Sequence, residues 1–418
     1  MKFLTSTLAL ASMLFALTPS AQEVGSLKHE AYIWQRVWTP SLVEAVRNHG
    51  TNFSELVVLK TEIAWERQEP RVSRARIDYP ALKDTKVPLG LALRIGPFRG
   101  PFTTNDNVAV LLKKLATEMV SEARSNQVTP VELQIDFDCA ESNLGGYRLW
   151  VQAIVQAVAP LPVRITALPA WLNRSSFKPL AKAAGAYVLQ VHSLERPKDA
   201  QASVKLCDPG AALKAVDKAD LLGIPFRVAL PTYSYLLAFG TDGKFIGLSA
   251  EGPPAAWPEN AQVRELASDP SEIAQLVARW RTHRPRNMGG LLWFRLPSSK
   301  DSFNWRWPTL AAIISGQLPR ETMRVELRRV DARLTEIDFV NAGEIDFSSR
   351  LAVEVHWENA RLVAADALSG FEILNQEPTA VRFQSKIQPV RIRTGERMTI
   401  GWVRLDQERE VRCEFKKL

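Results

Sequence analysis

Short β-rich runs alternate with longer amphipathic stretches along the chain from His29 to about Gln317, and this alternation occurs about eight times. The predicted strands are 31–38, 55–65, 88–96, 131–138, 162–168, 186–193, 225–231 and 289–297. Apolar residues recur every three or four positions between them, which predicts helices. This pattern is clearest over 107–125, 144–159, 211–222 and 270–282. Eight strand-then-helix units favour an α/β fold, a parallel (β/α)8 barrel of TIM type over residues 29–317, more than a doubly wound sheet.

The seventh unit is longer than the others. Its strand and the apolar residues after it are followed by the turn Thr241-Asp242-Gly243-Lys244 and by a second β-rich run, 245–252. This pattern predicts a hairpin inserted at the end of a barrel strand. On the catalytic face of a barrel, such an insertion would form one wall of a groove.

The pattern changes after Pro319, where short alternating strands follow one another without long helical segments. Turns such as Asn341-Ala342-Gly343 separate them. This spacing predicts a small C-terminal β-sandwich of immunoglobulin-like type over residues 320–418.

The N-terminus has the pattern of a secretory signal peptide over residues 1–20. Lys2 precedes an apolar run from Leu8 to Leu17, and small residues follow as far as Ala21. Cleavage after Ser20 and cleavage after Ala21 both fit. No later stretch approaches the roughly 18 apolar residues of a membrane-spanning helix. We therefore expect a periplasmic or secreted protein without a transmembrane segment.

Composition narrows the function classes. Apolar residues make up 46% of the chain, enough for packed cores, and the formal net charge is +8. Lysine and arginine are scattered rather than arranged as a stripe, so we expect no nucleic-acid partner. No glycine-rich phosphate loop and no metal-ligand cysteine spacing is present, so we predict neither cofactor nor metal. An oxidising compartment allows one disulfide, and the hypothesis is a Cys139–Cys207 bond, because both residues follow predicted strands towards one barrel face.

The fourth predicted strand carries the main candidate chemistry. With a period of two, Glu132, Gln134, Asp136 and Asp138 face the barrel axis, while the apolar residues between them face the helices. Burying two carboxylates together costs about several kcal/mol unless they are hydrogen-bonded or share a proton. The two aspartates end the strand on the face where barrel active sites lie. The alternative interpretation is a structural ion pair with Arg94 or bound water.

Other strands supply companions for these carboxylates at the same end of the barrel. The same alternation of inward and outward side chains in the other strands places a group of polar and aromatic residues on the inward face: Arg94, Gln190, His192, Trp293 and Arg295. Aromatic residues also lie near the ends of strands, where a sugar ring could stack on them: Trp34, Trp65 and Tyr233. Any one of them could equally be a core residue.

Three segments carry a family resemblance: LQIDFDCAE in the fourth strand, LLGIPFRVALPTYSY around the seventh, and GGLLWFRL in the eighth. They resemble the chitinase-like family 18 glycoside hydrolases, whose fourth strand reads DxxDxDxE. The 29–317 region also resembles an uncharacterised group of secreted bacterial proteins with such a barrel. The resemblance matches Asp136 and Asp138 to the last two aspartates of the motif. It matches Trp293 to the tryptophan at the pocket floor.

The match departs from the family at the catalytic glutamate. That position is Ala140, the nearest carboxylate is Glu141, and the first aspartate of the motif falls on Leu133. In the family, the glutamate protonates the leaving oxygen while the acetamido group of the substrate attacks. We expect a glycoside hydrolase acting on a polysaccharide or cell-envelope glycan, with Asp138 or Glu141 as the acid and Asp136 tuning it. The alternative is a non-catalytic sugar-binding or envelope-assembly protein on the same barrel.

Overall fold

The computed structural model describes residues 26–418 except 68, 104–105, 193–196, 250–255 and 387–389. The predicted signal peptide lies outside the described residues. Eight parallel strands form a closed barrel, because the first strand pairs with both the second strand and the last. In barrel order they are β1 (Lys28–Ile33), β2 (Leu56–Glu66), β4 (Leu89–Ile95), β5 (Glu132–Phe137), β6 (Val163–Ala167), β7 (Tyr187–Gln190), β8 (Phe226–Pro231) and β12 (Met288–Phe294).

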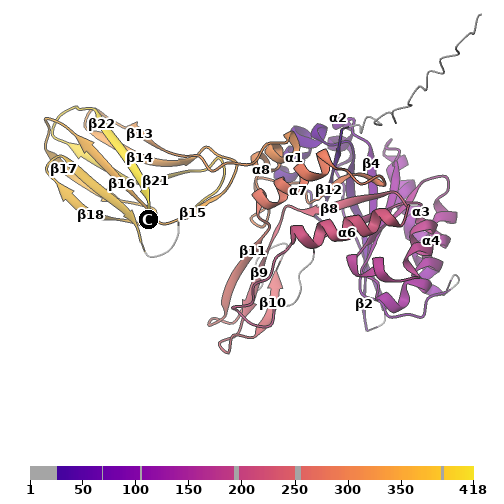
Figure 1. The fold of residues 1–418 in the computed structure, drawn as a ribbon. Coiled ribbons are helices and arrows are strands. Elements are labelled where there is room, and N and C mark those ends of the chain that lie inside the picture. Colours follow the sequence, from indigo (N-terminus) through magenta and orange to yellow (C-terminus); the bar gives the residue numbers. More distant parts are fainter. Residues whose placement is uncertain (1–25, 68, 104–105, 193–196, 250–255, 387–389) are drawn as a thin grey trace, which may run out of the picture.

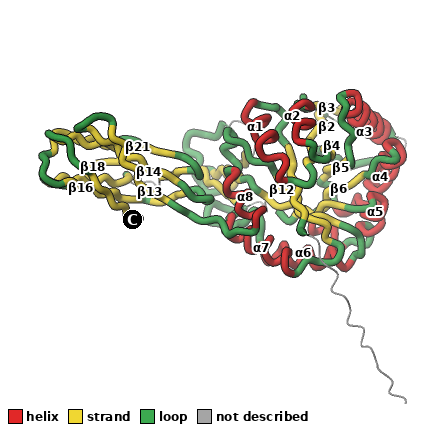
Figure 2. The backbone as a smooth tube through the Cα atoms, turned by 90° about the horizontal axis from the view of Figure 1, so that it is seen from above, coloured by secondary structure: helices red, strands yellow, loops and turns green. Residues whose placement is uncertain are grey.

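Helices surround the barrel strands (Figure 2). They are α1 (Pro40–His49), α2 (Tyr79–Thr85), α3 (Asn107–Ser125), α4 (Leu144–Val158), α5 (Phe177–Ala184), α6 (Pro209–Leu221), α7 (Pro270–Thr282) and α8 (Trp307–Ser315). Short 3-10 helices cover Gly50–Asn52, Glu141–Asn143 and Pro169–Asn173. Capping side chains fix where several helices begin: Thr39 caps α1, and aspartates cap α2, α3, α6 and α7. Each cap accepts a backbone N–H that the first helical turn leaves unpaired.

Two apolar layers hold the barrel together. The outer layer lies between strands and helices and includes Leu133, Ile135 and Phe137 of β5. The inner layer fills the barrel and includes Tyr32, Trp34, Val57, Leu59, Ala92, Val188, Ala229 and Leu292. Because both strand faces are buried, strands such as β2 and β4 begin as nearly continuous apolar runs, whereas β5 alternates polar and apolar residues.

The predicted insertion after the seventh barrel strand is a three-stranded antiparallel sheet. Its strands are β9 (Ser234–Phe239), β10 (Phe245–Ser249) and β11 (Gln262–Ala267), with β9 in the centre. Figure 1 shows this sheet extending from the barrel. A further strand, β3 (Glu69–Arg74), pairs antiparallel with the end of β2. The sequence pattern predicted the β9–β10 hairpin but neither β11 nor β3.

The C-terminal region consists of antiparallel sheets that project from the barrel (Figure 1). One sheet has the order β13-β14-β21-β17, another β18-β19-β16-β22, and β15 pairs with β20. The strands are β13 (Met323–Arg329), β14 (Leu334–Asn341), β15 (Phe347–Ser349), β16 (Leu351–Trp357), β17 (Leu362–Ala367), β18 (Phe371–Glu377), β19 (Ala380–Ser385), β20 (Val390–Ile392), β21 (Arg397–Leu405) and β22 (Val411–Lys417). The two four-stranded sheets share one buried core, which includes Phe339, Val353, Phe383 and Val403.

The predicted fold class is therefore confirmed: a closed (β/α)8 barrel precedes a β-rich C-terminal region. The domain boundaries and the immunoglobulin-like type stay predictions. Within the described residues, no helix is both long enough and apolar enough to cross a membrane.

Candidate functional site

Asp136 lies at the carboxyl end of β5, inside the barrel. Its Oδ1 accepts hydrogen bonds from Thr166 Oγ1 at 2.8 Å and from Gln190 Nε2 at 3.2 Å. Burial, and to a smaller extent the neighbouring charge of Asp138, raises the pKa of the Asp136 carboxyl to about 6. The Arg94 guanidinium and the two hydrogen bonds act in the opposite direction. Asp136 is therefore an acid whose protonation changes near neutral pH.

Arg94 connects Asp136 to the neighbouring strand. Its Nε lies 3.9 Å from Asp136 Oδ2 and 3.7 Å from Glu62 Oε1. The structure thus brings together two predicted companions of Asp136, Arg94 and Gln190. Thr166 was not among the predicted site residues, although it lies on the inward face of β6.

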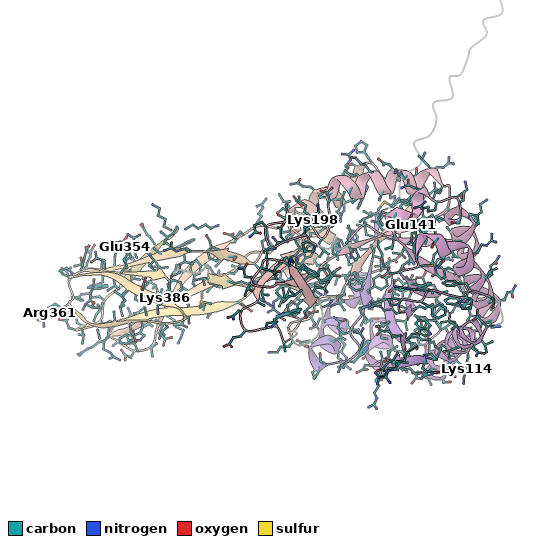
Figure 3. All side chains as sticks on the ribbon, turned by 90° about the horizontal axis from the view of Figure 1, so that it is seen from below. Lys114, Glu141, Lys198, Glu354, Arg361 and Lys386 are labelled. Atoms are coloured by element: carbon teal, nitrogen blue, oxygen red, sulfur yellow. The ribbon has the colours of Figure 1, made fainter. Side chains whose placement is uncertain are left out.

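Asp138 follows β5 and is exposed at the mouth of the barrel. Glu141 lies three residues further on, in the 3-10 helix that leads into α4. The carboxylate of Glu141 binds the guanidinium of Arg174, with both side chains more than a third exposed. Figure 3 shows Glu141 on the barrel, far from Glu354 and Arg361 in the C-terminal sheets. Of the two acids proposed from the sequence, Asp138 is the one whose charge acts on Asp136 and raises the pKa of its carboxyl.

Aromatic rings gather around Phe294 at the end of β12. Trp34, Tyr233 and His192 lie with their ring centroids 5.3, 5.3 and 5.8 Å from that of Phe294. Trp34 and Tyr233 are buried, whereas Phe294 is partly exposed. Three predicted site residues are thus neighbours, but the ring at their centre is one that the sequence analysis missed.

His192 is held as a neutral imidazole in this aromatic group. Its Nδ1 lies 3.3 Å from the hydroxyl of Tyr233, which in turn donates to the hydroxyl of Tyr235. Burial lowers the pKa of His192 to about 4. Among the described residues its Nε2 is buried and has no hydrogen-bond partner. A neutral His192 can position a ligand hydroxyl, but it carries no charge at neutral pH.

The placement of Trp293 inside the pocket is wrong. Trp293 is fully buried in the outer layer, stacks on His29, and donates from Nε1 to His29 Nδ1 at 3.1 Å. The inward residues of β12 are Leu292 and Phe294, which pack in the inner layer. The predicted alternation was right, but its phase was shifted by one residue.

Arg295 and Trp65 are seen with partners other than Asp136. Arg295 follows β12 and makes two hydrogen bonds, of 2.9 and 3.0 Å, to the Asp301 carboxylate. Trp65 packs against Phe98, with ring centroids 4.7 Å apart, beside the outer layer.

The hypothesis of a Cys139–Cys207 disulfide is contradicted. Both thiols are free and buried in the outer apolar layer. Strand β6 separates the loops in which they lie, and burial raises the pKa of each thiol to about 12. Within the described residues, no group of three or more His, Cys, Asp or Glu side chains is arranged to hold a metal ion.

A second polar group lies at the opposite, amino-terminal end of the barrel. Arg227 on β8 binds the carboxylates of Glu30 and Glu132 and lies 3.7 Å from Glu55. Above it, Tyr32 donates to Gln134, and Gln134 donates to Glu132. These inward polar residues of β5 are therefore hydrogen-bonded, as burial requires. We call Glu30, Glu55, Glu132 and Arg227 the floor network.

Residues 89–299 match a family model described as "Domain of unknown function (DUF3142)". The chain belongs to the DUF3142 family. The match begins with β4 and ends after β12, so it includes Asp136 and, from the aromatic group, His192, Tyr233 and Phe294, whereas Trp34 lies before it. A comparison with curated proteins finds no match.

Solved structures similar to this DUF3142 protein have chitinase-like barrels. The spore cortex-lytic enzyme SleL of Bacillus megaterium QM B1551 is 11% identical, with a TM-score of 0.50 over 70% of this chain and 74% of that one. Chitinase ChiA74 of Bacillus thuringiensis is 10% identical, with a TM-score of 0.45 over 94% of this chain and 100% of that one. At such identities the similarity concerns the fold, and it supports the predicted distant resemblance to chitinase-like barrels.

Proposed function

We propose that this protein is a secreted or periplasmic glycoside hydrolase acting on a polysaccharide or cell-envelope glycan. The observation that carries the proposal is the Asp136–Asp138 pair at the barrel mouth. Burial raises the pKa of both carboxyls, that of Asp136 to about 6. The Asp136 charge also acts on Tyr32, whose ring centroid lies 5.7 Å from that of Phe294. A general acid works best when its pKa lies near the working pH.

In this proposal Asp138 is the acid and Asp136 adjusts its protonation. Asp138 is exposed, so a glycosidic oxygen can reach it, while Asp136 is held inside by Thr166 and Gln190. Burial raises the pKa of the Asp138 carboxyl as well. The two carboxyls interact, so the proton that the pair holds near pH 6 belongs to both groups and is available on the exposed Asp138. Glu141 is the weaker candidate, because its carboxylate is occupied by Arg174.

The aromatic group around Phe294 would bind the sugar next to this acid. Phe294 is partly exposed, and a sugar ring can stack on an aromatic face. Buried Trp34 supports Phe294 from below in the inner layer. Arg94, with a side chain 37% exposed, can donate to sugar hydroxyls from the other side of Asp136.

A specific observation favours a second candidate, a non-catalytic sugar-binding or envelope-assembly protein. Alanine occupies position 140, where chitinase-like hydrolases have their acid, and the neighbouring Glu141 is engaged in an ion pair. A binding protein needs the aromatic group but no proton donor.

Screening the mature protein against a glycan array, then assaying the best ligand for release of reducing ends, separates the two. Cleavage supports the hydrolase, and binding without cleavage supports the second candidate. Absence of both binding and cleavage would overturn the carbohydrate function altogether.

A further inference from the structure

A cavity of about 410 Å³ lies where the barrel, the inserted sheet and the C-terminal sheets meet. We call it the junction cavity. Its walls include Tyr233 from the loop after β8, Ser268 from the loop before α7, Asn304 and Trp305 from the loop after β12, and Arg391 from β20. Small-molecule sites in proteins usually enclose about 300–1,000 Å³. The junction cavity is thus large enough for a small ligand.

Two buried polar atoms in this wall lack a partner. Ser268 is 5% exposed and Asn304 is 8% exposed. Among the described residues, neither Ser268 Oγ nor Asn304 Oδ1 has a hydrogen-bond partner. Buried polar groups in folded proteins are nearly always hydrogen-bonded, so these two atoms point to a bound group that completes them.

The chemistry of that group follows from the orientation of the Asn304 amide. Its nitrogen donates to the backbone carbonyls of Arg295 at 3.1 Å and Leu296 at 3.5 Å. Carbonyl oxygens only accept, so the amide cannot be reversed and Oδ1 remains an acceptor. Ser268 Oγ can accept as well as donate. The group that completes this wall must therefore donate hydrogen bonds.

Charge at the rim disfavours an anion. Arg391 is bound by both Glu265 and Asp346, and Ser234 also donates to Glu265. The positive charge of Arg391 is outweighed by these two carboxylates and by Asp269, which also lines the cavity and caps α7. A neutral ligand that bears hydroxyl groups satisfies the wall without opposing this charge.

Aromatic side chains complete the cavity. Trp305 donates from Nε1 to the carbonyl of Ser268, which fixes the ring in the wall. Tyr233 lines the cavity and also contacts His192 of the mouth. An aromatic wall with hydroxyl-accepting atoms is the usual environment of a bound sugar.

We propose that the junction cavity is a second carbohydrate-binding subsite, which takes one neutral sugar unit through Ser268 and Asn304. The identity of the ligand rests on the proposed glycan function. The lining of the junction cavity does not include the carboxylate pair, and Tyr233 connects the cavity to His192 of the aromatic group.

The first test is crystallographic. Crystals of the full mature protein are soaked with N-acetylglucosamine, glucose or galactose, and with the β-1,4-linked tetramer of N-acetylglucosamine. A sugar ring bonded to Ser268 Oγ and Asn304 Oδ1 supports the proposal. Water molecules alone in the junction cavity in all four soaks overturn it. Density at Asp138 tests the proposed function independently, so the two ideas can fail separately.

The second test is calorimetric, on the sugar that the crystals show. Ser268→Ala removes a hydroxyl that has no protein partner, so it should leave the melting temperature unchanged or slightly raised. It should weaken binding of that sugar about fivefold. Thr394→Val is the matched control, because Thr394 Oγ1 is also buried without a partner near the C-terminal sheets but lines a different cavity. Equal affinity of Ser268→Ala and wild type would contradict the subsite.

Discussion

Replacing Glu55 by glutamine should flatten the pH dependence of stability, because this carboxyl lies in the floor network. Its Oε2 is 3.7 Å from Arg227, and the glutamates at positions 132 and 30 are close enough to act on its charge. Burial, followed by these two carboxylates, raises the pKa of Glu55 to about 9. Gly90 allows the crowding, since a Cβ there would lie 2.7 Å from Glu55 Oε1.

The size of the effect follows from the difference between the folded and unfolded pKa. An ordinary glutamate has a pKa of 4.5, so the folded state holds a proton that the unfolded state releases between about pH 4.5 and 9. The stability from this proton is complete below the lower pKa and is lost as pH rises towards the upper one. At up to about 1.4 kcal/mol per pH unit, the loss between pH 5 and 7.5 is on the order of 3 kcal/mol.

Urea denaturation of wild type and Glu55→Gln at pH 5, 6 and 7.5 measures this effect. Glutamine retains the neutral form and its hydrogen-bond donor, so the two proteins should be similar at pH 5 and differ by about 3 kcal/mol at pH 7.5 in favour of the variant. Glu44→Gln, at an exposed position on α1, is the control and should follow wild type. The other buried acids are present in both proteins, so their contributions to the pH dependence cancel in the difference between the two unfolding free energies. Parallel profiles for Glu55→Gln and wild type would refute the reasoning.

Three further predictions concern the floor network, the cysteine thiols and the carboxylate pair at the barrel mouth. Arg227→Met leaves Glu30 and Glu132 without their cation, so it should cost about 3–5 kcal/mol of unfolding free energy at pH 7.5 and less at pH 5, measured by urea denaturation. A thiol titration of the unreduced protein should find three free thiols after denaturation, with the two buried ones unreactive in the native state; one free thiol would contradict the structure. Because the pKa of Asp136 is about 6, kcat/KM for glycan cleavage should fall above pH 6 by up to about tenfold per unit, and a flat profile from pH 6 to 8 would exclude the pair as the acid.

Much of the barrel could be predicted because apolar residues are spaced differently in its strands and in its helices. The helix predicted over 107–125 has the same bounds as α3, and the predicted strand 131–138 contains β5. In β5, polar residues alternate with apolar ones, so the inward face was evident. In β12 both faces are buried apolar surfaces, and hydrophobicity alone cannot decide whether Trp293 or Phe294 faces the axis.

Other features depend on contacts between distant segments, which a single sequence does not encode locally. Thr166 on β6 donates to Asp136 on β5, a contact between residues that are 30 positions apart in the sequence. Residues 268 and 304 line one cavity because separate loops converge there. The pair Cys139 and Cys207 shared a predicted face, yet the structure packs both thiols in the outer layer instead.

The most direct test of the central claim is Asp138→Asn, with melting temperature and glycan cleavage measured on the same preparation. Asp138 is exposed and its charge raises the pKa of Asp136, so neutralising it should leave the melting temperature unchanged or higher. Cleavage should be abolished, or affinity weakened by about 2 kcal/mol if the protein only binds. Glu141→Gln is the control and should retain function. A destabilised Asp138→Asn protein with unchanged glycan cleavage and binding would contradict the assignment of the functional centre to this carboxylate pair.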